Sequence, residues 1–326
     1  MEIKNVLKSN KTIRGLGKKV NIYSQFLQDA KDFSEHYVEI ANNKGDFRYS
    51  IMLLVHSLEK GMCMPNPRPF GLDKAKELIS QLSAYPETNR NDFEYELGIS
   101  ILFAWSDFFE SHGWQNEVVY SEVKDFLKNK KRPPEIIAGS KLYKPKETVA
   151  NEDIIAEMLL SRHSVRNLQD KKIDPADMQF ALRCFVETPT ACNRQMCRVY
   201  YIQTPEITDL LNRVVIGVPG FNKKTVQYFV ITYDLASFAY SGERQQGLFN
   251  AGLCTMNFVH GLHAKGIGSC CLQWSNKHKQ DAEVRKKLKL SDSERIAIVI
   301  GAGYYLDENI IPCSVRRKTD DVFKII

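Results

Sequence analysis

The sequence predicts an α+β protein with a helical region at its N-terminus, and three observations support this fold class. Apolar residues recur at helical spacing through residues 20–130. A segment rich in lysine and proline, 128–150, then interrupts the pattern. Beyond this segment, helical segments alternate with strand-like runs, as in an α+β or α/β domain. We therefore expect a helical N-terminal domain (1–127), a linker (128–150) and a C-terminal domain (151–326).

Two helices are well defined in the N-terminal region. The apolar residues of 72–84 fall on one helical face: Leu72, Ala75, Leu78, Ile79 and Leu82. Asn91 followed by Glu94 predicts a cap for the next helix, which has a broad apolar side. Before the first of these helices, residues 62–71 contain three prolines in five positions, which excludes a helix there.

The C-terminal region mixes both kinds of element. Residues 152–160 form a short helical pattern, and Asp174-Pro175 predicts the start of a helix over 174–187. Three runs are strand-like: 198–202, 227–233 and 295–300. Residues 249–264 are apolar nearly all round, which indicates a helix buried in a core or a subunit interface.

Composition narrows the class of protein. The 326 residues carry a formal net charge of +6, which fits an anionic ligand but is too small to indicate nucleic acid. The longest apolar run, 51–55, is far shorter than the roughly 20 residues of a transmembrane helix. No apolar stretch typical of a secretory signal follows the charged N-terminus. We expect a soluble, cytoplasmic protein without a transmembrane segment.

Much of the basic excess lies in the first 20 residues, where only Glu2 opposes six basic side chains. These are Lys4, Lys8, Lys11, Arg14, Lys18 and Lys19. Such a segment is either a solvated arm or a contact for an anionic membrane surface. We favour the solvated arm, because few apolar residues separate the charges.

The eight cysteines do not follow a metal-binding pattern. The sequence has no C-x-x-C and no cysteine–histidine cluster with zinc spacing. Cys270 and Cys271 are adjacent, so their side chains point in opposite directions on a strand. We expect most of the eight to be small buried apolar residues in a reducing compartment, and no metal site.

Two polar motifs open the C-terminal domain. Ser161-Arg-His-Ser-Val-Arg166 offers two guanidinium groups, a histidine and a hydroxyl, which suit a phosphate monoester. Taken alone, a short basic segment is usually solvated surface. Thr188-Pro-Thr-Ala-Cys-Asn-Arg-Gln195 is a polar turn whose amide side chains can bind a heterocycle edge or a polyol. Taken alone, it is an ordinary loop between a helix and a strand.

Two further motifs follow. Gly266-Ile-Gly-Ser-Cys-Cys-Leu-Gln-Trp274 comes directly after the apolar helix and also fits a helix end followed by a core strand. Ser314-Val-Arg-Arg-Lys318 supplies cations far in sequence from the first basic cluster.

The order and spacing of these four motifs resemble the nitroreductase family, which binds FMN. In that family an R-x-S-x-R element begins the domain, and a P-[ST]-x-x-N-x-Q turn follows. A long helix then leads into a G-x-G-x-C-type turn, and an arginine lies near the C-terminus. Here Asn193 follows Arg162 by 31 positions. The resemblance covers about residues 151–326 and implies a central antiparallel sheet flanked by helices.

The resemblance implies two groups of residues around the cofactor. The group expected to hold the phosphate and reach the near edge of the flavin is Arg162, His163, Ser164 and Arg166, with Arg316 closing from the C-terminal segment. The group expected along the ribityl chain and the ring is Thr190, Asn193, Gln195, Cys271, Leu272 and Gln273, with a backbone N–H donating to flavin N5. Because Arg316 and Arg317 are adjacent, the phosphate arginine can be either one.

The resemblance also implies the partners and the reaction. Family members are homodimers with the flavin at the interface, so residues 249–264 would lie in the dimer core. Hydride would pass from NADH or NADPH through flavin N5 to an unidentified small molecule, with no catalytic side chain and no metal. The sequence has no G-x-G-x-x-G after a strand to decide between the two donors.

One segment lies outside the minimal family domain. His56-Ser-Leu-Glu-Lys-Gly-Met62 resembles the N-terminal H-x-L-E-K-G-[LM] segment of a longer subgroup, which is associated with bacterial polysaccharide biosynthesis. It either covers the flavin pocket or forms a helix end, with Lys60 at the negative end of the helix dipole and Gly61 at C′. We favour the helix end. Arg244 and Trp274 are candidate pocket residues, although a core position suits Trp274 better.

Three functions remain open at this stage. The leading one is an FMN-dependent oxidoreductase. The second is a flavin-binding interaction or regulatory subunit with little turnover. The third is a protein without flavin that uses the arginine cluster for another phosphorylated ligand.

Overall fold

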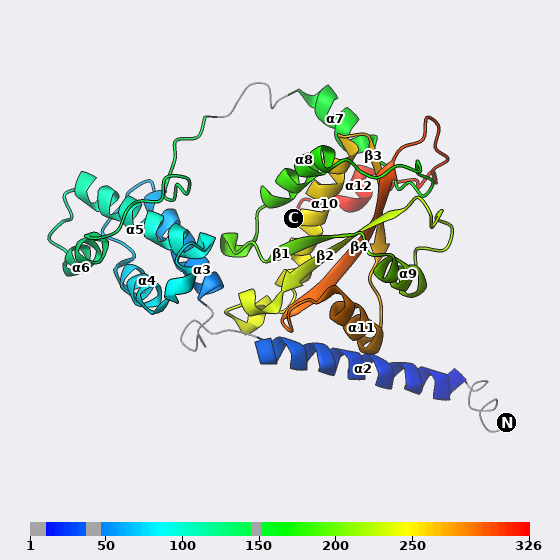
Figure 1. Cartoon of the computed structure of the whole chain (residues 1–326), viewed down its shortest axis with the longest axis horizontal. Coiled ribbons are helices and arrows are strands. Elements are labelled where there is room, and N and C mark those ends of the chain that lie inside the picture. Colours follow the sequence, from blue (N-terminus) through cyan, green and yellow to red (C-terminus); the bar gives the residue numbers. More distant parts are fainter. Residues whose placement is uncertain (1–10, 37–46, 145–150) are drawn as a thin grey trace.

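The protein is described by a computed structural model that covers residues 11–36, 47–144 and 151–326 (Figure 1). In the N-terminal part, the helices are α2 (Lys11–His36), α3 (Arg48–Met62), α4 (Leu72–Ala84), α5 (Phe93–Ser111) and α6 (Val118–Leu127), with the short turn η2 (Glu87–Asn89). The expected helical region and the helix over 72–84 are confirmed.

Helices α3 to α6 share a core of their own. Leu58, Leu78 and Trp105 are completely buried in it. The predicted cap at Asn91 is wrong by one residue, because Asp92 occupies the N-cap of α5 and no side-chain hydrogen bond caps the helix. Glu94 still lies in the first turn, where its charge suits the positive end of the helix dipole.

Residues 128–144, the described part of the expected linker, contain no helix or strand. They nevertheless lie against the N-terminal helices. The Ser100 hydroxyl donates to the carbonyl of Ile136 and accepts from the amide of Ala138 at 3.1 Å. The boundaries of the three expected regions stay a prediction. The hydrogen bonds of Ser100 nevertheless attach residues 136–138 of the expected linker to α5.

The C-terminal part is built around one antiparallel sheet of four strands. The strands, β1 (Cys197–Ile202), β2 (Gln227–Asp234), β3 (Ile267–Gln273) and β4 (Glu294–Tyr304), lie in the order β1-β2-β4-β3. The helices are α7 (Glu152–Leu160), α8 (Pro175–Val186), α9 (Pro205–Val214), α10 (Gln246–His263), α11 (His278–Leu288) and α12 (Thr319–Val322). Three short turns complete the order: η4 (Ala191–Asn193), η5 (Leu235–Ser237) and η6 (Ser241–Glu243). The predicted α+β class and the three strand-like runs are confirmed.

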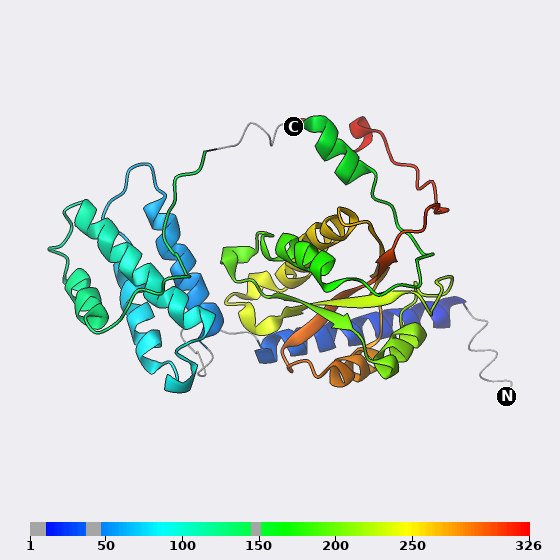
Figure 2. The ribbon, with the colours of Figure 1, turned by 45° about the horizontal axis from the view of Figure 1, so that its top comes forward.

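Helices cover both faces of the sheet (Figure 2). Because side chains alternate along a strand, Tyr228 and Val230 pack with the α9 and α11 side, whereas Phe229 and Ile231 pack with α8 and α10. Gly261 lets α10 approach α8 closely, since a Cβ there would lie 2.6 Å from the backbone of Ala181. The sheet is therefore buried on both faces.

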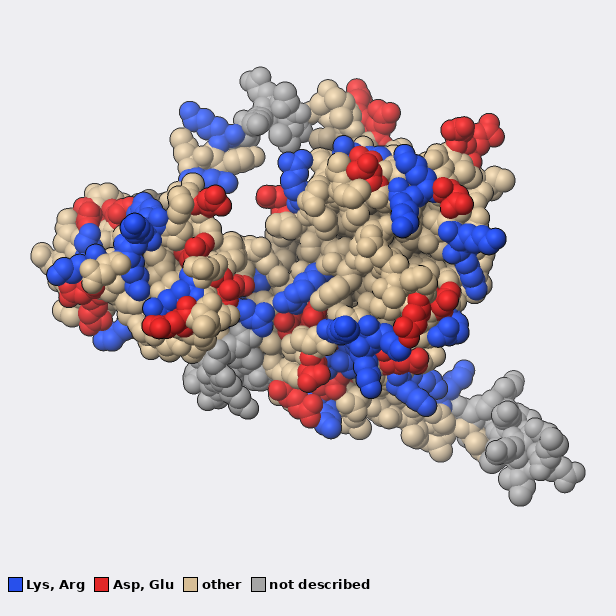
Figure 3. Space-filling view, viewed as in Figure 1, with Lys and Arg blue, Asp and Glu red and all other residues tan. Residues whose placement is uncertain are grey.

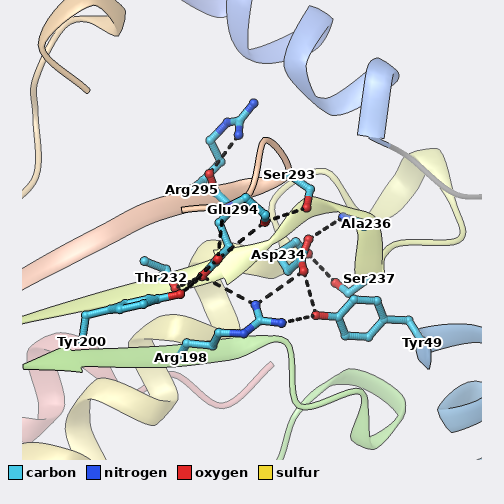
Figure 4. Close-up of polar contacts among 11 residues, drawn as sticks. Tyr49, Arg198, Tyr200, Thr232, Asp234, Ala236, Ser237, Ser293, Glu294 and Arg295 are labelled. Carbon is cyan, nitrogen blue, oxygen red and sulfur yellow. Dashed lines mark hydrogen bonds and ion pairs between the residues drawn. The ribbon is translucent and has the colours of Figure 1, made fainter. Parts of the chain in front are cut away.

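A polar cluster joins α3 to the end of the sheet (Figure 4). The Arg198 guanidinium lies 3.4 Å from Asp234 and 3.6 Å from Glu294, and both carboxylates are buried. From α3, the Tyr49 hydroxyl donates to Asp234 at 2.9 Å. Burial, followed by the nearby Asp234 charge, raises the pKa of Tyr49, so its hydroxyl keeps the proton that it donates. Tyr200 donates to Glu294 at 2.8 Å.

Helix α2 lies against the C-terminal part, although it comes first in the sequence. Its Asp32 carboxylate is 2.8 Å from the Arg295 guanidinium, and Asp29 is 3.2 Å from His278. Phe33 stacks on Phe238 with ring centroids 5.9 Å apart. In Figure 2, α2 runs along the sheet face that also carries α9 and α11. None of the described helices has both the length and the apolar character needed to cross a bilayer.

We predict that Arg198→Met destabilises the protein by about 3–5 kcal/mol, because it leaves two buried carboxylates without their cation. The matched control is Arg132→Met, since Arg132 pairs with Asp107 on the surface and such pairs contribute about 1 kcal/mol or less. Urea unfolding of both variants measures the difference. Equal losses in the two variants would show that the Arg198 cluster contributes no more than a surface ion pair.

Candidate functional site

The first and third motifs lie side by side at the edge of the sheet. After α7, the chain pairs with β3, the outer strand of the sheet, in a parallel bridge between Ser164 and Ser269. The Val165 amide donates to the Ser269 carbonyl at 3.1 Å. This pairing brings the basic segment 161–166 next to β3 at Ser269.

His263, at the end of α10, and Tyr305, directly after β4, hold the start of the basic segment. The Ser161 hydroxyl is 2.8 Å from Nε2 of His263, and Nδ1 of His263 is 2.9 Å from the Tyr305 hydroxyl. Burial lowers the pKa of His263, and the positive charge of Arg162 lowers it further. The imidazole therefore favours its neutral form, which can donate one hydrogen bond and accept the other.

The cations of this segment are not neutralised by carboxylates. Among the described residues, no ion pair involves Arg162, His163 or Arg166. Arg162 is half-buried and close enough to lower the pKa of His260 as well as that of His263, after the larger effect of burial. The segment is therefore a positive region that suits an anion.

Strand β3 presents alternate side chains as the sequence predicted. Cys270 is buried and Cys271 is exposed, and both are free thiols. Leu272 points into the core, where it packs against the chain at Gly217. Of the three residues predicted to pass the flavin ring, only Cys271 and Gln273 have exposed side chains. Leu272 can contribute its backbone alone.

The second motif is a strained turn. Cys192, Asn193 and Gln195 have φ angles of 53°, 52° and 48°, in the left-handed region that residues other than glycine rarely adopt. Such conformations cost about 1–3 kcal/mol each and cluster at ligand-binding sites. The Thr190 hydroxyl accepts a bond from the Gln195 amide at 2.9 Å and helps to hold the turn.

Arg194 supports the turn from inside. Its guanidinium is buried and donates to the carbonyls of Ala191 and Ser237, at 3.0 and 2.7 Å. It also binds both carboxylate oxygens of Glu243, one of them at 3.1 Å. Burial acts to raise the pKa of Glu243, but the bonds from Arg194 and from two backbone amides outweigh it, so the pKa is lowered. This pair could not be predicted, because nothing in the sequence relates positions 194 and 243.

Helix α10 separates the second motif from the other two. Its Asn250 accepts from the Ala191 amide at 3.3 Å, whereas its His263 binds Ser161. These two residues are 13 positions apart, or roughly 20 Å along a helix. The structure therefore brings the first and third motifs together and places the turn 190–195 at the opposite end of α10.

The fourth motif is not brought to the site within one chain. Arg316 and Arg317 are exposed on an extended segment, and no hydrogen bond or ion pair links either one to another described residue. The predicted role of Arg316 at the phosphate stays a prediction.

Two polar atoms on α10 are buried without a partner among the described residues. They are Nδ1 of His260 and Nδ2 of Asn250. Burying such atoms without a hydrogen bond costs about 1–3 kcal/mol each, so native proteins rarely leave them unpaired. Nδ1 of His260 lies near the basic segment, and Nδ2 of Asn250 lies near the turn. A polar ligand at either place can supply the missing hydrogen bond.

Comparison with known proteins identifies the fold of this region. Residues 159–304 match the model of the nitroreductase family. This matched part of the chain is a nitroreductase-family region. A comparison with curated proteins gave no match.

Solved structures resemble the nitroreductase domain over about half of the chain. The nitroreductase family protein of Streptococcus pneumoniae TIGR4 has 22% identity and a TM-score of 0.45, covering 53% of this chain and 100% of that one. A Parabacteroides distasonis protein named as an NADH dehydrogenase/NAD(P)H nitroreductase has 19% identity and a TM-score of 0.45, covering 51% and 95%. A nitroreductase of Desulfovibrio desulfuricans, solved in complex with FMN, has 19% identity and a TM-score of 0.45, covering 53% and 96%.

The segment 56–62 lies in α3, outside the residues that match the nitroreductase family. The helix ends in this segment, at Met62 with Cys63 at its C-cap, and Lys60 lies in the last turn as predicted. The predicted position of Gly61 at C′ is wrong, because Gly61 is still helical. Gly61 is instead a packing position, because a Cβ there would lie 2.1 Å from the Phe70 ring. Glu59 accepts from the Gly139 amide at 3.3 Å, and burial raises its pKa. A role in covering the flavin stays a prediction.

The two candidate pocket residues of the nitroreductase domain, Trp274 and Arg244, have different surroundings. Trp274 is half-buried against the core and donates to Asp281 at 2.9 Å, as the core interpretation expects. Arg244 is exposed. Within the described ranges, no three histidine, cysteine or acidic side chains gather as a metal site. His260 and His263 were missed, although their spacing of three residues on the apolar helix was a usable signal.

We predict that the Arg194–Glu243 pair makes stability depend on pH. Because the pKa of Glu243 is lowered in the folded protein, the pair stabilises fully above the ordinary glutamate pKa of about 4.3, and this contribution is lost as the pH falls through the lowered value. Glu243→Gln should therefore lose less stability than the wild type between neutral and acidic pH. Urea unfolding across that range measures this. Glu87→Gln, at an exposed carboxylate, is the control, and parallel curves for all three proteins would contradict the prediction.

Proposed function

We propose that the protein is an FMN-dependent oxidoreductase that uses NADH or NADPH as the electron donor. The observation that carries the proposal is the Ser164–Ser269 pairing within a nitroreductase domain. It joins a basic segment suited to a phosphate with the strand segment expected beside the flavin ring.

The phosphate end of the proposed site is the segment 162–166. Arg162 and Arg166 can each bind two phosphate oxygens, and Ser164 can donate a further hydrogen bond. Their charges have no carboxylate partners among the described residues, so an incoming phosphate meets no competing anion. The buried Nδ1 of His260 is a polar atom nearby that still needs a partner.

The ring end of the proposed site combines β3 with the turn 190–195. Cys271 and Gln273 present exposed side chains on β3. In the turn, Thr190, Asn193 and Gln195 offer the polar groups expected along the ribityl chain and the pyrimidine ring. The buried guanidinium of Arg194 restrains the turn, because it donates hydrogen bonds to the carbonyls of Ala191 and Ser237.

We propose that a second copy of the chain completes the site. Within one chain the turn lies roughly 20 Å from the basic segment along α10, farther than a mononucleotide can bridge comfortably while contacting both. Helix α10 also exposes apolar residues on one face: Leu248, Phe249, Leu253 and Met256. An exposed apolar helix face marks an interface, and a symmetric dimer through it would place the turn of one copy near the basic segment of the other.

The chemistry that FMN would supply is hydride transfer from NADH or NADPH to an acceptor. The residues of the chain bind and orient the group rather than react. The arginines fix the phosphate, and the rigid turn and β3 fix the ring between them. The acceptor is proposed to be a small molecule whose pocket borders α3, because α3 packs directly on η4 within this turn.

The first test is the absorption spectrum of the purified protein. We expect a flavin spectrum that is lost in the double variant Arg162→Ala, Ser164→Ala, with FMN affinity reduced by about a hundredfold. Arg213→Ala, at an exposed arginine of α9, is the control and should leave the spectrum unchanged. A colourless protein that cannot be reconstituted with FMN would refute the proposal in favour of another phosphorylated ligand.

The second test separates an oxidoreductase from a flavin-binding regulatory subunit. Anaerobic mixing with NADH or NADPH should bleach the flavin within a catalytic time range, which stopped-flow absorbance measures. If neither nucleotide reduces the flavin, the oxidoreductase function is wrong and the regulatory one is favoured.

The third test concerns the second copy. Phe249→Asp changes an exposed residue, so it should leave the monomer fold intact while breaking a dimer through α10. We expect analytical ultracentrifugation to show a monomer, together with a loss of FMN binding. A variant that stays dimeric, or a monomer that binds FMN as the wild type does, would contradict a site shared between two copies.

A further inference from the structure

The N-terminal helix α2 has two halves with different surroundings. Its C-terminal half is attached to the nitroreductase domain through Asp29, Asp32 and Phe33. Its N-terminal half extends past the sheet towards the start of the chain, as Figure 1 shows. All side chains described from Gly15 to Ser24 are exposed.

The outward side of α2 carries a narrow apolar stripe, formed by Leu16, Val20, Tyr23 and Leu27. Their spacings of four, three and four residues place them on one helical face. Each is between 60% and 71% exposed, so the chain itself does not cover the stripe. With a rotation of about 100° per residue, the stripe points away from the face that Asp32 and Phe33 dock on the domain.

The charges of α2 are divided between the same two halves. From residue 3 to residue 28 the sequence has six basic residues and no acidic one, whereas Asp29, Asp32 and Glu35 all lie in the docked half. Lys18 and Lys19 are exposed, and no ion pair between described residues involves either. In Figure 3 the end of α2 beyond the sheet is blue and tan, without red.

In place of the solvated arm favoured from the sequence, we propose that the N-terminal half of α2 binds an anionic membrane surface, with the exposed stripe lying in the boundary between headgroups and acyl chains. A helix with basic flanks, low mean hydropathy and an apolar stripe with an aromatic residue is suited to lie in the plane of such an interface. The long stem of Lys19, beside the stripe, can reach from the interface back to the anionic headgroups, and Lys18 on the far side adds to the positive charge of this half of the helix.

Charge and position favour a membrane over a second copy of the chain. Two such helices packed through their stripes would bring identical lysines together without acidic partners, and like charges repel. The stripe also lies on the side of the sheet that carries α9 and α11, whereas the proposed dimer face of α10 lies on the other side (Figure 2). The stripe therefore remains accessible in a dimer formed through α10.

The test is co-sedimentation of the full protein with vesicles. We expect binding to an equimolar mixture of phosphatidylcholine and phosphatidylglycerol, none to phosphatidylcholine alone, and release at about 1 M salt, where the Debye length falls to about 3 Å. Leu16→Gln with Leu27→Gln, and separately Lys18→Glu with Lys19→Glu, should each reduce binding by about tenfold or more.

Two control variants carry the same chemical changes elsewhere. Ile137→Gln with Leu142→Gln alters apolar residues that are 91% and 85% exposed, and Lys141→Glu with Lys144→Glu alters exposed lysines. Both controls should bind as the wild type does, and circular dichroism checks that all variants fold.

Three results would overturn the proposal: no sedimentation with the anionic vesicles, equal losses in the control variants, or stripe variants that bind vesicles normally. If ultracentrifugation shows that the stripe variants lose only self-association, the stripe is a contact between copies of the chain. None of these outcomes depends on flavin, so they are distinguishable from a failure of the proposed oxidoreductase function.

Discussion

The ion cluster around Arg198 is the interaction on which the arrangement of this protein depends most. A single guanidinium from β1 lies between buried carboxylates from β2 and β4, Asp234 and Glu294. The cluster has two carboxylates but one guanidinium, so hydroxyl groups, including that of Tyr49 in α3, donate further hydrogen bonds to the carboxylates. The cluster therefore fastens three strands to one another and also fixes where the N-terminal helices meet the sheet.

This attachment has a consequence for the site. Because Tyr49 lies at the start of α3, the same helix reaches η4, the turn that Arg194 holds in its strained conformation. The long helix α10 then sets the distance between that turn and the basic segment held by His263. The sheet, the buried Arg194 and the length of α10 together decide which of these polar groups can meet within one chain.

The individual helices and strands could be predicted from the sequence, because each is determined by residues close to one another in the chain. Asp174 and Pro175 cap and start α8 as predicted, and the alternation of Cys270 and Cys271 follows from the geometry of β3. The errors have local causes as well. Gly61 was interpreted as a helix end, whereas the Phe70 ring occupies the space where a Cβ would lie, so glycine is needed there for packing.

The sequence by itself determined the class of fold, the family of the C-terminal domain and the residue types around the proposed phosphate, since these depend on spacing along the chain. Only the tertiary structure decided which motifs are neighbours. The Ser164–Ser269 pairing, the Arg194–Glu243 pair and the docking of α2 on the distant sheet all join residues far apart in sequence. Such contacts arise from the packing of whole elements, and no periodicity along the chain encodes them.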